Sequence, residues 1–297
     1  RYDRLVLSPG IDLVYDSVPG YSLEGSNIAP HAWKSATQLA LLRARALAMR
    51  PGGTFVYVAP PDPSRCPPGP YERVCMLAHL FKQHNPSAKI VVLDPKEKFA
   101  KQALFQSAWE KHYPGMVLWL PASMSGGLLD VDLSRMVFTT ELEAFKADAA
   151  SVVPAQTAAT VATRAGLGDD SGWVPVDPST LQTRANPDIH VLGDAARAEA
   201  MPKSAFAANN QAHVVVAALR AALLDTPAPA VEYANTCWSQ LAAQDSVKIG
   251  ARYRPAANGI EAFDSFISEL DEDEQHRART SHEARAWYTA ITRDMFG

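Results

Sequence analysis

The chain has 297 residues, of which 47% are hydrophobic and 20% charged, with a formal net charge of −4. This composition is enough to bury a core and excludes intrinsic disorder. The slightly acidic balance argues against nucleic acid, which selects a basic surface. No apolar run reaches the roughly 18 residues that a membrane span needs. The three cysteines include no C-x-x-C spacing, so no metal site is expected.

The first half of the chain alternates strand and helix patterns. Residues 5–8 are a short predicted strand, and apolar residues at helical spacing predict a helix over 34–49. The patterns that follow predict strands at 54–59, 89–93 and 116–120, with helices at 70–84 and 101–112 between them. This order predicts a βαβαβ unit with a parallel sheet, and therefore an α/β fold.

The second half is less regular. Weak alternation over 131–145 predicts a β-hairpin arm, and 152–165 leads into a loop rich in glycine and aspartate. A strand at 189–193 and a long helix at 204–224 follow. Prolines at 227 and 229 mark a linker before a small module at 231–297.

The turn after the strand at 54–59 excludes a common cofactor. In a pyridine-nucleotide enzyme this turn carries G-x-G-x-x-G, whose glycines let the backbone approach the pyrophosphate. Here the turn is rich in proline, whose rings fill space and remove N–H donors. We expect the unit to keep the shape of an NAD domain without binding NAD.

A second motif indicates a flavin. An apolar strand ends at Gly193 and Asp194, and a Pro-Lys-Ser sequence at 202–204 then opens a long helix. Gly193 allows close backbone approach, and Asp194 can accept a ribitol hydroxyl of FAD. The helix beginning near Ser204 would direct its free N–H groups toward the flavin ring. Because the chain has no G-x-G-x-x-G for the other half of FAD, we expect an incomplete site that binds FAD weakly or not at all.

Several segments, in the same order along the chain, resemble the flavoprotein subunit of flavocytochrome c sulfide dehydrogenase. They are residues 31–34, 65–73, 101–103, 170–173, 201–205, 235–237, 287–288 and 296–297. The resemblance implies a two-dinucleotide-binding-domain flavoprotein, similar to glutathione reductase, with a small α+β C-terminal domain. It also implies sulfide oxidation in the periplasm, with electrons passing through FAD to a cytochrome c subunit.

The resemblance assigns a redox-active disulfide to Cys66 and Cys237. Sulfide would attack one sulfur of the pair and release the other as a thiolate. Glu72 matches a glutamate beside that disulfide, where it would accept a proton or tune the thiolate. The alternative for Glu72 is a carboxylate favoured by the dipole at a helix N-terminus.

The resemblance implies that the remaining matched residues lie on the flavin side of the site. Lys203, Ser204 and Ala205 would lie near the flavin, although a surface lysine is an alternative for Lys203. Trp287 would pack near the flavin or anchor the C-terminal tail in the core. Cys75 lies outside the pattern and is expected to be a buried free thiol.

The expected organisation has four parts. They are a remnant of the FAD domain at 1–22 with its first Rossmann segment truncated, an NAD-like domain at 23–155, a second part of the FAD domain at 156–229 and an interface domain at 230–297. Two other functions stay open. One is a flavoprotein that acts on a sulfur carrier, and the other is a non-catalytic fragment that serves as an interaction module and forms homo-oligomers.

Overall fold

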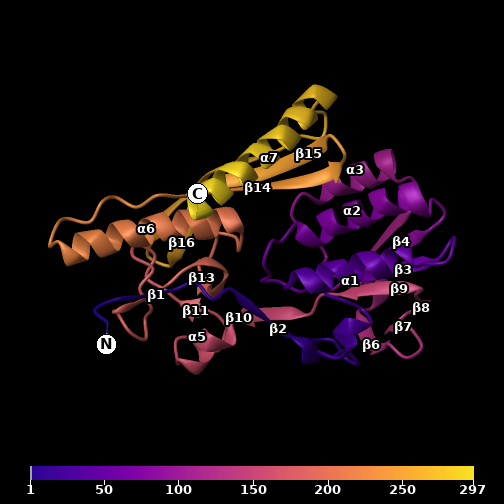
Figure 1. Ribbon diagram of the computed structural model, residues 1–297, viewed down its shortest axis with the longest axis horizontal. Helices are drawn as coiled ribbons and strands as arrows, with labels where there is room; N and C mark the ends of the chain where they lie inside the picture. The colour runs from indigo at the N-terminus through magenta and orange to yellow at the C-terminus, as the bar shows by residue number, and fades with distance from the viewer. Residues whose placement is uncertain (1) are drawn as a thin grey trace.

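A four-stranded parallel sheet forms the centre of one half of the molecule. The structure is a computed structural model that describes residues 2–297 (Figure 1). The strand order is β5-β4-β3-β9, from β3 (Thr54–Val58), β4 (Lys89–Asp94), β5 (Val117–Pro121) and β9 (Ala149–Val152). The predicted parallel βαβαβ unit is confirmed. The fourth strand, β9, was not predicted and pairs with β3.

The two faces of this sheet pack against different layers. Phe55 and Tyr57 face the core shared with α1 (Ala36–Leu47), α2 (Gly69–His84) and α3 (Gln102–His112). Val56 and Val58, which point to the opposite face, pack in a second core with Phe138. Burial on both faces explains why these strands read as continuous apolar runs.

The hairpin predicted at 131–145 has one strand too few. The segment is a three-stranded antiparallel meander of β6 (Leu128–Asp132), β7 (Val137–Thr140) and β8 (Ala144–Lys146). A short helix, α4 (Ala122–Ser125), precedes it. The third strand forms because the chain turns again after β7, where the Thr140 hydroxyl donates to the Glu143 carbonyl at 2.8 Å.

The other half is built from small paired strands and one long helix. β1 (Leu5–Leu7) pairs in parallel with β12 (Ile189–Val191), and β2 (Ile11–Val14) pairs antiparallel with β10 (Ala155–Ala158). β11 (Val174–Pro175) pairs with β13 (Ala196–Arg197), near the helix α5 (Thr160–Arg164). The turn η3 (Gly193–Ala195) follows β12, and α6 (Ala205–Leu223) begins shortly afterwards. Two 3₁₀ helices, η1 (Tyr15–Ser17) and η2 (Gly25–Asn27), lie in the segment that runs from β2 to α1 and so links the two halves.

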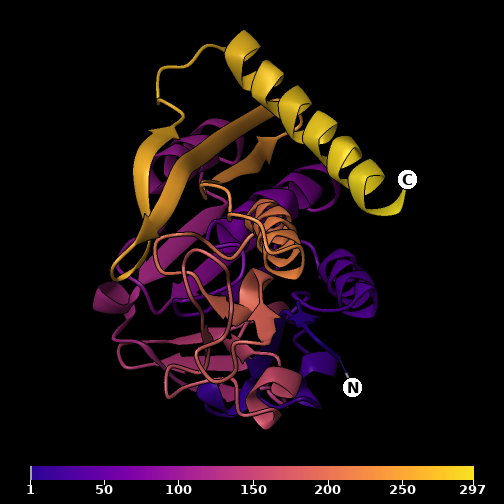
Figure 2. The same ribbon diagram turned by 90° about the vertical axis from the view of Figure 1, so that its left-hand side faces the viewer.

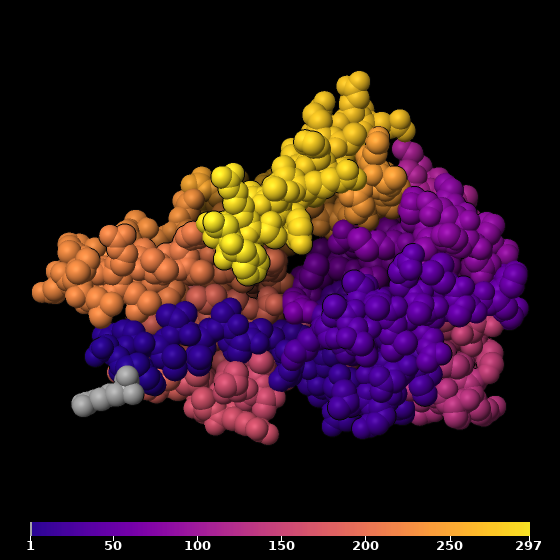
Figure 3. Space-filling view, in the orientation of Figure 1, coloured from indigo at the N-terminus to yellow at the C-terminus, as the bar shows by residue number. Residues whose placement is uncertain are grey.

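A C-terminal sheet and helix join the two halves. β14 (Tyr233–Ala242), β15 (Asp245–Ala256) and β16 (Gly259–Ile267) form an antiparallel sheet, with α7 (Glu274–Phe296) packed on β15 and β14 (Figure 2). β14 also contacts α2 and α6, which belong to different halves. In the space-filling view, the C-terminal residues in yellow lie across the boundary between the orange and purple parts (Figure 3). Among residues 2–297, no helix combines the length and apolar character required to cross a bilayer.

Candidate functional site

Two cysteines separated by 171 residues line one cavity. Cys66 lies in the proline-rich loop between β3 and α2, and Cys237 lies on β14. The cavity has a volume of about 270 Å³, and both cysteines line it as free thiols. The fold therefore brings together the two residues that the resemblance pairs.

The loop around Cys66 is shaped to present its sulfur. The Cys66 N–H donates to the Lys203 carbonyl at 2.7 Å, and the Gly69 N–H donates to the Cys66 carbonyl at 2.7 Å. Cys66 adopts a left-handed backbone conformation with φ of 55°. A Cβ at Gly69 would lie 2.9 Å from Cys66 Sγ and 2.9 Å from a ring carbon of Trp33. Gly69 therefore leaves the space that the sulfur occupies.

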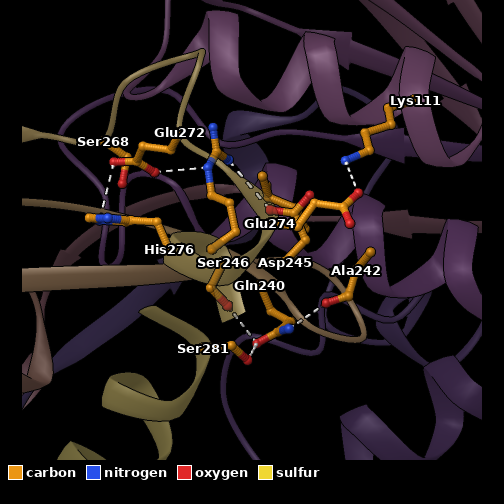
Figure 4. Close-up of polar contacts among 12 residues, drawn as sticks. Lys111, Gln240, Ala242, Asp245, Ser246, Ser268, Glu272, Glu274, His276 and Ser281 are labelled. Carbon is orange, nitrogen blue, oxygen red and sulfur yellow. Dashed lines mark hydrogen bonds and ion pairs between the residues drawn. The ribbon is translucent and has the colours of Figure 1, made fainter. Parts of the chain in front are cut away.

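Glu72 links α2 to the strand that carries Cys237. Its carboxylate Oε1 accepts the Gln240 N–H at 2.8 Å and lies at the cavity wall. The Gln240 side chain in turn accepts the hydroxyls of Ser246 at 2.7 Å and Ser281 at 3.2 Å, which ties β14 to β15 and α7 (Figure 4). Burial raises the pKa of Glu72, so this carboxylate is a better proton acceptor than an exposed one.

Asn235 connects Cys237 to the beginning of α6. The Asn235 Nδ2 atom lies 3.4 Å from Cys237 Sγ, and the Ser204 hydroxyl donates to Asn235 Oδ1 at 2.5 Å. Ser204 is the N-cap of α6, and its Oγ accepts the Ala207 N–H at 3.0 Å. The cap thus fixes both the helix terminus and the amide beside Cys237. Ala205, the exposed first residue of α6, also lines the cavity.

Three aromatic rings close the cavity on the side of α7. The Trp287 ring is stacked on Phe206, with centroids 5.8 Å apart, and on Trp238, with centroids 5.5 Å apart. Trp287 thus lies in the same cavity as the two cysteines. Both interpretations given for Trp287 agree with this position, because the stack also anchors α7.

Lys101 is a site residue that the pattern of the sequence did not identify. Its side chain is only 4% exposed, and its Nζ donates to Ser239 Oγ at 2.7 Å and to the Cys237 carbonyl at 3.1 Å. Burial lowers the pKa of Lys101 to about 8. The only sequence signal was its membership in the matched segment 101–103.

Gly193 and Asp194 lie in η3, the turn before α6, where Asp194 provides a buried carboxylate. Gly193 has φ of +71°, and a Cβ there would lie 3.0 Å from Ser8 Oγ. Burial raises the pKa of Asp194, although the charges of Arg65 and Lys203 oppose this effect. The Asp194 Oδ1 atom is buried and accepts no hydrogen bond from the residues that the structure describes.

These features fit part of a flavin site. A buried acceptor without a partner is costly unless a ligand donates to it, and a ribitol hydroxyl is such a donor. The first N–H groups of α6, a helix of 19 residues, have no intrahelical carbonyl to bind. Ser204 Oγ accepts the Ala207 N–H, and the N–H groups of Ala205 and Phe206 remain as donors to an electron-rich group.

Lys203 and Cys75 occupy enclosed positions. The Lys203 Nζ donates to the carbonyls of Asp194 at 2.8 Å and Ala196 at 2.9 Å, and it lies 3.6 Å from the centroid of the Trp173 ring. Lys203 thus shapes the turn that holds Asp194. Cys75 is buried, as expected, and its Sγ accepts the Trp109 indole N–H at 3.2 Å.

Two family models match more than half of the chain. Residues 39–154 match the central part of the sulfide dehydrogenase (flavocytochrome c) flavoprotein chain. Residues 229–296 match the flavin-binding part of flavocytochrome c sulphide dehydrogenase. The C-terminal segment, predicted as an interface domain, thus matches a model described as flavin-binding.

Solved structures show the fold. A FAD-dependent pyridine nucleotide-disulphide oxidoreductase from Desulfovibrio vulgaris is 20% identical, with a TM-score of 0.50 over 84% of this chain and 61% of that chain. A NAD-dependent persulfide reductase from A. fulgidus is 12% identical, with a TM-score of 0.54 over 94% and 57%. A chain of the covalent putidaredoxin reductase–putidaredoxin complex is 15% identical, with a TM-score of 0.60 over 94% and 69%.

The chain spans between 49% and 69% of the length of such solved chains. At these identities the likeness is one of fold, and it confirms the expected α/β architecture of the FAD- and NAD-linked disulfide oxidoreductases. The two family models carry the assignment further, because their matched segments hold Cys66 and Cys237. The chain belongs to the family of flavoprotein chains of flavocytochrome c sulfide dehydrogenase.

Proposed function

We propose that this chain oxidises sulfide through the Cys66–Cys237 pair and bound FAD. One observation carries the proposal: two cysteines 171 residues apart line a single cavity together with Glu72 and the start of α6. Unrelated buried cysteines have no reason to share a small cavity with a carboxylate and a helix N-terminus. The family assignment supports the same chemistry.

The first step is thiol–disulfide exchange. The hydrosulfide ion attacks one sulfur of the oxidised pair, the bond between the two cysteines breaks, and its electron pair leaves on the other sulfur as a thiolate. The attacked cysteine then carries a persulfide. Glu72 lies at the cavity wall with a raised pKa, so it can take the proton of hydrogen sulfide as the nucleophile forms.

On the flavin side, Asp194 offers its free Oδ1 to a hydroxyl of the ribityl chain, and the start of α6 offers backbone donors. Gly193 keeps the backbone close to the ligand. FAD, when bound, would supply a two-electron acceptor that can also release electrons singly. The cavity, with a volume of about 270 Å³, has room for a small nucleophile such as hydrosulfide.

We also propose a cytochrome c subunit as electron acceptor and the periplasm as the location. Both rest on family membership. Co-purification of a haem protein with the chain from the periplasmic fraction tests both proposals. Recovery of the chain from the cytoplasmic fraction without haem would refute them.

The decisive experiment replaces Cys237 by serine in the flavin-loaded protein. Sulfide-dependent bleaching of the flavin band should be abolished, and mass spectrometry should no longer detect a persulfide on Cys66. The matched control is Cys75→Ala, since Cys75 lies outside the cavity. Undiminished bleaching by sulfide in the Cys237→Ser protein would refute the mechanism.

A further inference from the structure

Lys101 places a buried positive charge beside the backbone of Cys237. Its Nζ is 3.1 Å from the Cys237 carbonyl oxygen, and the side chain is 4% exposed. Lysine is among the residues least often buried, because an ammonium loses its hydration there. A lysine in this position therefore requires a compensating partner.

The Lys101 ammonium has one N–H donor beyond those bound by the Cys237 carbonyl and Ser239. An ammonium has three N–H donors, and the structure assigns two of them, to the Cys237 carbonyl and Ser239 Oγ. In their ionised forms, Cys237, Glu72 and Cys66 would each stabilise the Lys101 ammonium, in decreasing order. The third donor is therefore available to the thiol pair and its carboxylate.

Backbone strain marks the same place. Lys101 has φ of 64° and Cys66 has φ of 55°, both in the left-handed region. A residue with a side chain is strained in such a conformation and keeps it only when the surroundings enforce it. Lys101 is also the N-cap of α3, but an ammonium cannot accept the N–H groups of a helix N-terminus, and its Nζ donates to the Cys237 carbonyl on β14.

The two cysteines have unequal surroundings. Burial raises the pKa of the Cys66 thiol to about 12; Glu72 and Cys237 add to this effect, while Lys101 and the Gly69 N–H oppose it. Cys237 lies between the Lys101 ammonium, 3.1 Å from its carbonyl, and Asn235 Nδ2, 3.4 Å from its sulfur. The Lys101 ammonium acts on both cysteines, but it is bonded to the backbone of Cys237, whereas burial and the Glu72 carboxylate dominate the surroundings of Cys66.

We propose that Lys101 is a positioning residue that holds β14 at Cys237 and stabilises the Cys237 thiolate, so that the negative charge of the reduced pair lies on Cys237. This inference rests on the proposed function, in which the pair reacts with sulfide. Hydrosulfide then attacks Cys66 Sγ, a bond forms between these two sulfurs, and the bond to Cys237 breaks. The electron pair of that bond leaves on Cys237 Sγ, because the better-stabilised thiolate is the better leaving group.

The charged and titratable groups around Cys237 come from α3, α2 with its preceding loop, β15 and α7, while α6 lines the cavity with the uncharged Ala205 and Phe206. From α7, the Tyr288 phenol lines the cavity. Lys101 comes from the start of α3, Cys66 and Glu72 come from α2 and the loop before it, and Tyr253 comes from β15. Burial raises the pKa of Tyr253 to about 12, so its phenol is neutral near pH 8. Within this group, Lys101 contributes the positive charge.

The test measures thiol reactivity in the full chain without sulfide. The reduced protein is pulsed with iodoacetamide between pH 6 and pH 10, and peptide mass spectrometry gives the alkylation rates of Cys66 and Cys237. Each rate is divided by its own value at the highest pH, which removes differences in access. The variants are Lys101→Met, Lys101→Arg and the control Lys82→Met, an exposed lysine on α2. Circular dichroism reports their folding.

In the wild type, Cys237 should reach its half-maximal rate at a lower pH than Cys66. Lys101→Met should lower the rate at Cys237 about tenfold at pH 7.5, since an opposite charge within a few ångströms changes the thiolate fraction by about that much. Lys101→Arg should keep the wild-type profile, because the charge remains, and Lys82→Met should also keep it.

An unchanged Cys237 profile in folded Lys101→Met, or a Lys101→Arg protein that behaves like Lys101→Met, would overturn the proposal. If Lys101→Met does not fold, the wild type decides, because a Cys66 profile at or below the pH of Cys237 overturns it equally. The assay contains neither sulfide nor flavin turnover. Its failure is therefore distinct from sulfide oxidation that persists in Cys237→Ser, which would refute the proposed function instead.

Discussion

Replacing Gly69 by alanine tests whether the cavity geometry depends on this glycine. The added Cβ would lie 2.9 Å from both Cys66 Sγ and the Trp33 ring, whereas ordinary contacts begin at 3.4 Å. One or both neighbours must therefore move by about 0.5 Å, and the Trp33 ring is 8% exposed and held in the core. Overpacking of this kind costs about 1–3 kcal/mol.

An opposing effect must be weighed. Gly69 begins α2, and alanine in a compatible backbone stabilises a protein by about 0.4–1 kcal/mol, chiefly by restricting the unfolded chain. The steric cost is larger, so Gly69→Ala should lower the free energy of unfolding by about 1–2 kcal/mol. Urea denaturation followed by circular dichroism measures this change.

The matched control is Gly168→Ala. At Gly168 the nearest atoms to an added Cβ lie at 3.5 Å, an ordinary contact, so its effect should stay within about 0.5 kcal/mol. The displaced sulfur should also slow formation of the Cys66–Cys237 disulfide by a mild oxidant in Gly69→Ala alone. A Gly69→Ala protein as stable as the wild type, with unchanged disulfide formation, would show that the close packing around Cys66 is not a constraint.

Two further substitutions test the flavin side and the third cysteine. Because burial raises the pKa of Asp194 above 3.8, its stabilising contribution is present below pH 3.8 and is lost as the pH rises through the folded pKa. In the absence of flavin, Asp194→Asn should therefore be about 1 kcal/mol more stable than the wild type at pH 8. In urea titrations this gain in the free energy of unfolding should vanish toward pH 4. The variant should also bind FAD more weakly, because a ribityl hydroxyl loses its carboxylate acceptor. A gain that does not depend on pH would contradict this reasoning. Cys75→Ala should lower the free energy of unfolding by about 1–3 kcal/mol, because the Trp109 indole N–H loses its acceptor. Sulfide-dependent bleaching of the flavin should nevertheless stay within twofold of wild type. Lost bleaching in a folded Cys75→Ala protein would implicate Cys75 in the reaction with sulfide.

The regular elements were predictable where local pattern and tertiary structure agree. Strands β3 and β4 are buried on both faces, so apolar residues dominate their sequences. Strand β9 was missed because its sequence of two alanines, a serine and a valine has little intrinsic strand preference. It is a strand because it pairs with β3 and because the Ser151 hydroxyl donates to the Pro30 carbonyl at 2.7 Å, 121 residues away.

The same distinction applies to the site. The places of Gly193, Asp194 and Ser204 at a turn and a helix cap could be predicted, because the strand, the turn and the cap are contiguous in sequence; their role toward a flavin stays a prediction. Lys101 could not be predicted from pattern, since a lysine before a helix normally lies in solvent. Only the position of β14, 136 residues further along the chain, encloses it.

The site is assembled by three anchors that reach β14 from three separate segments. Glu72 on α2 binds the Gln240 N–H, Lys101 before α3 binds the Cys237 carbonyl, and Ser204 before α6 binds Asn235. Each anchor carries a charge or a cap that would be costly to bury without its partner on β14. The strand therefore satisfies all three at once when it docks, and the same docking brings Cys237 to the cavity of Cys66. For this reason the polar contacts that stabilise the junction of the two halves are also those that set the charge around the cysteine pair.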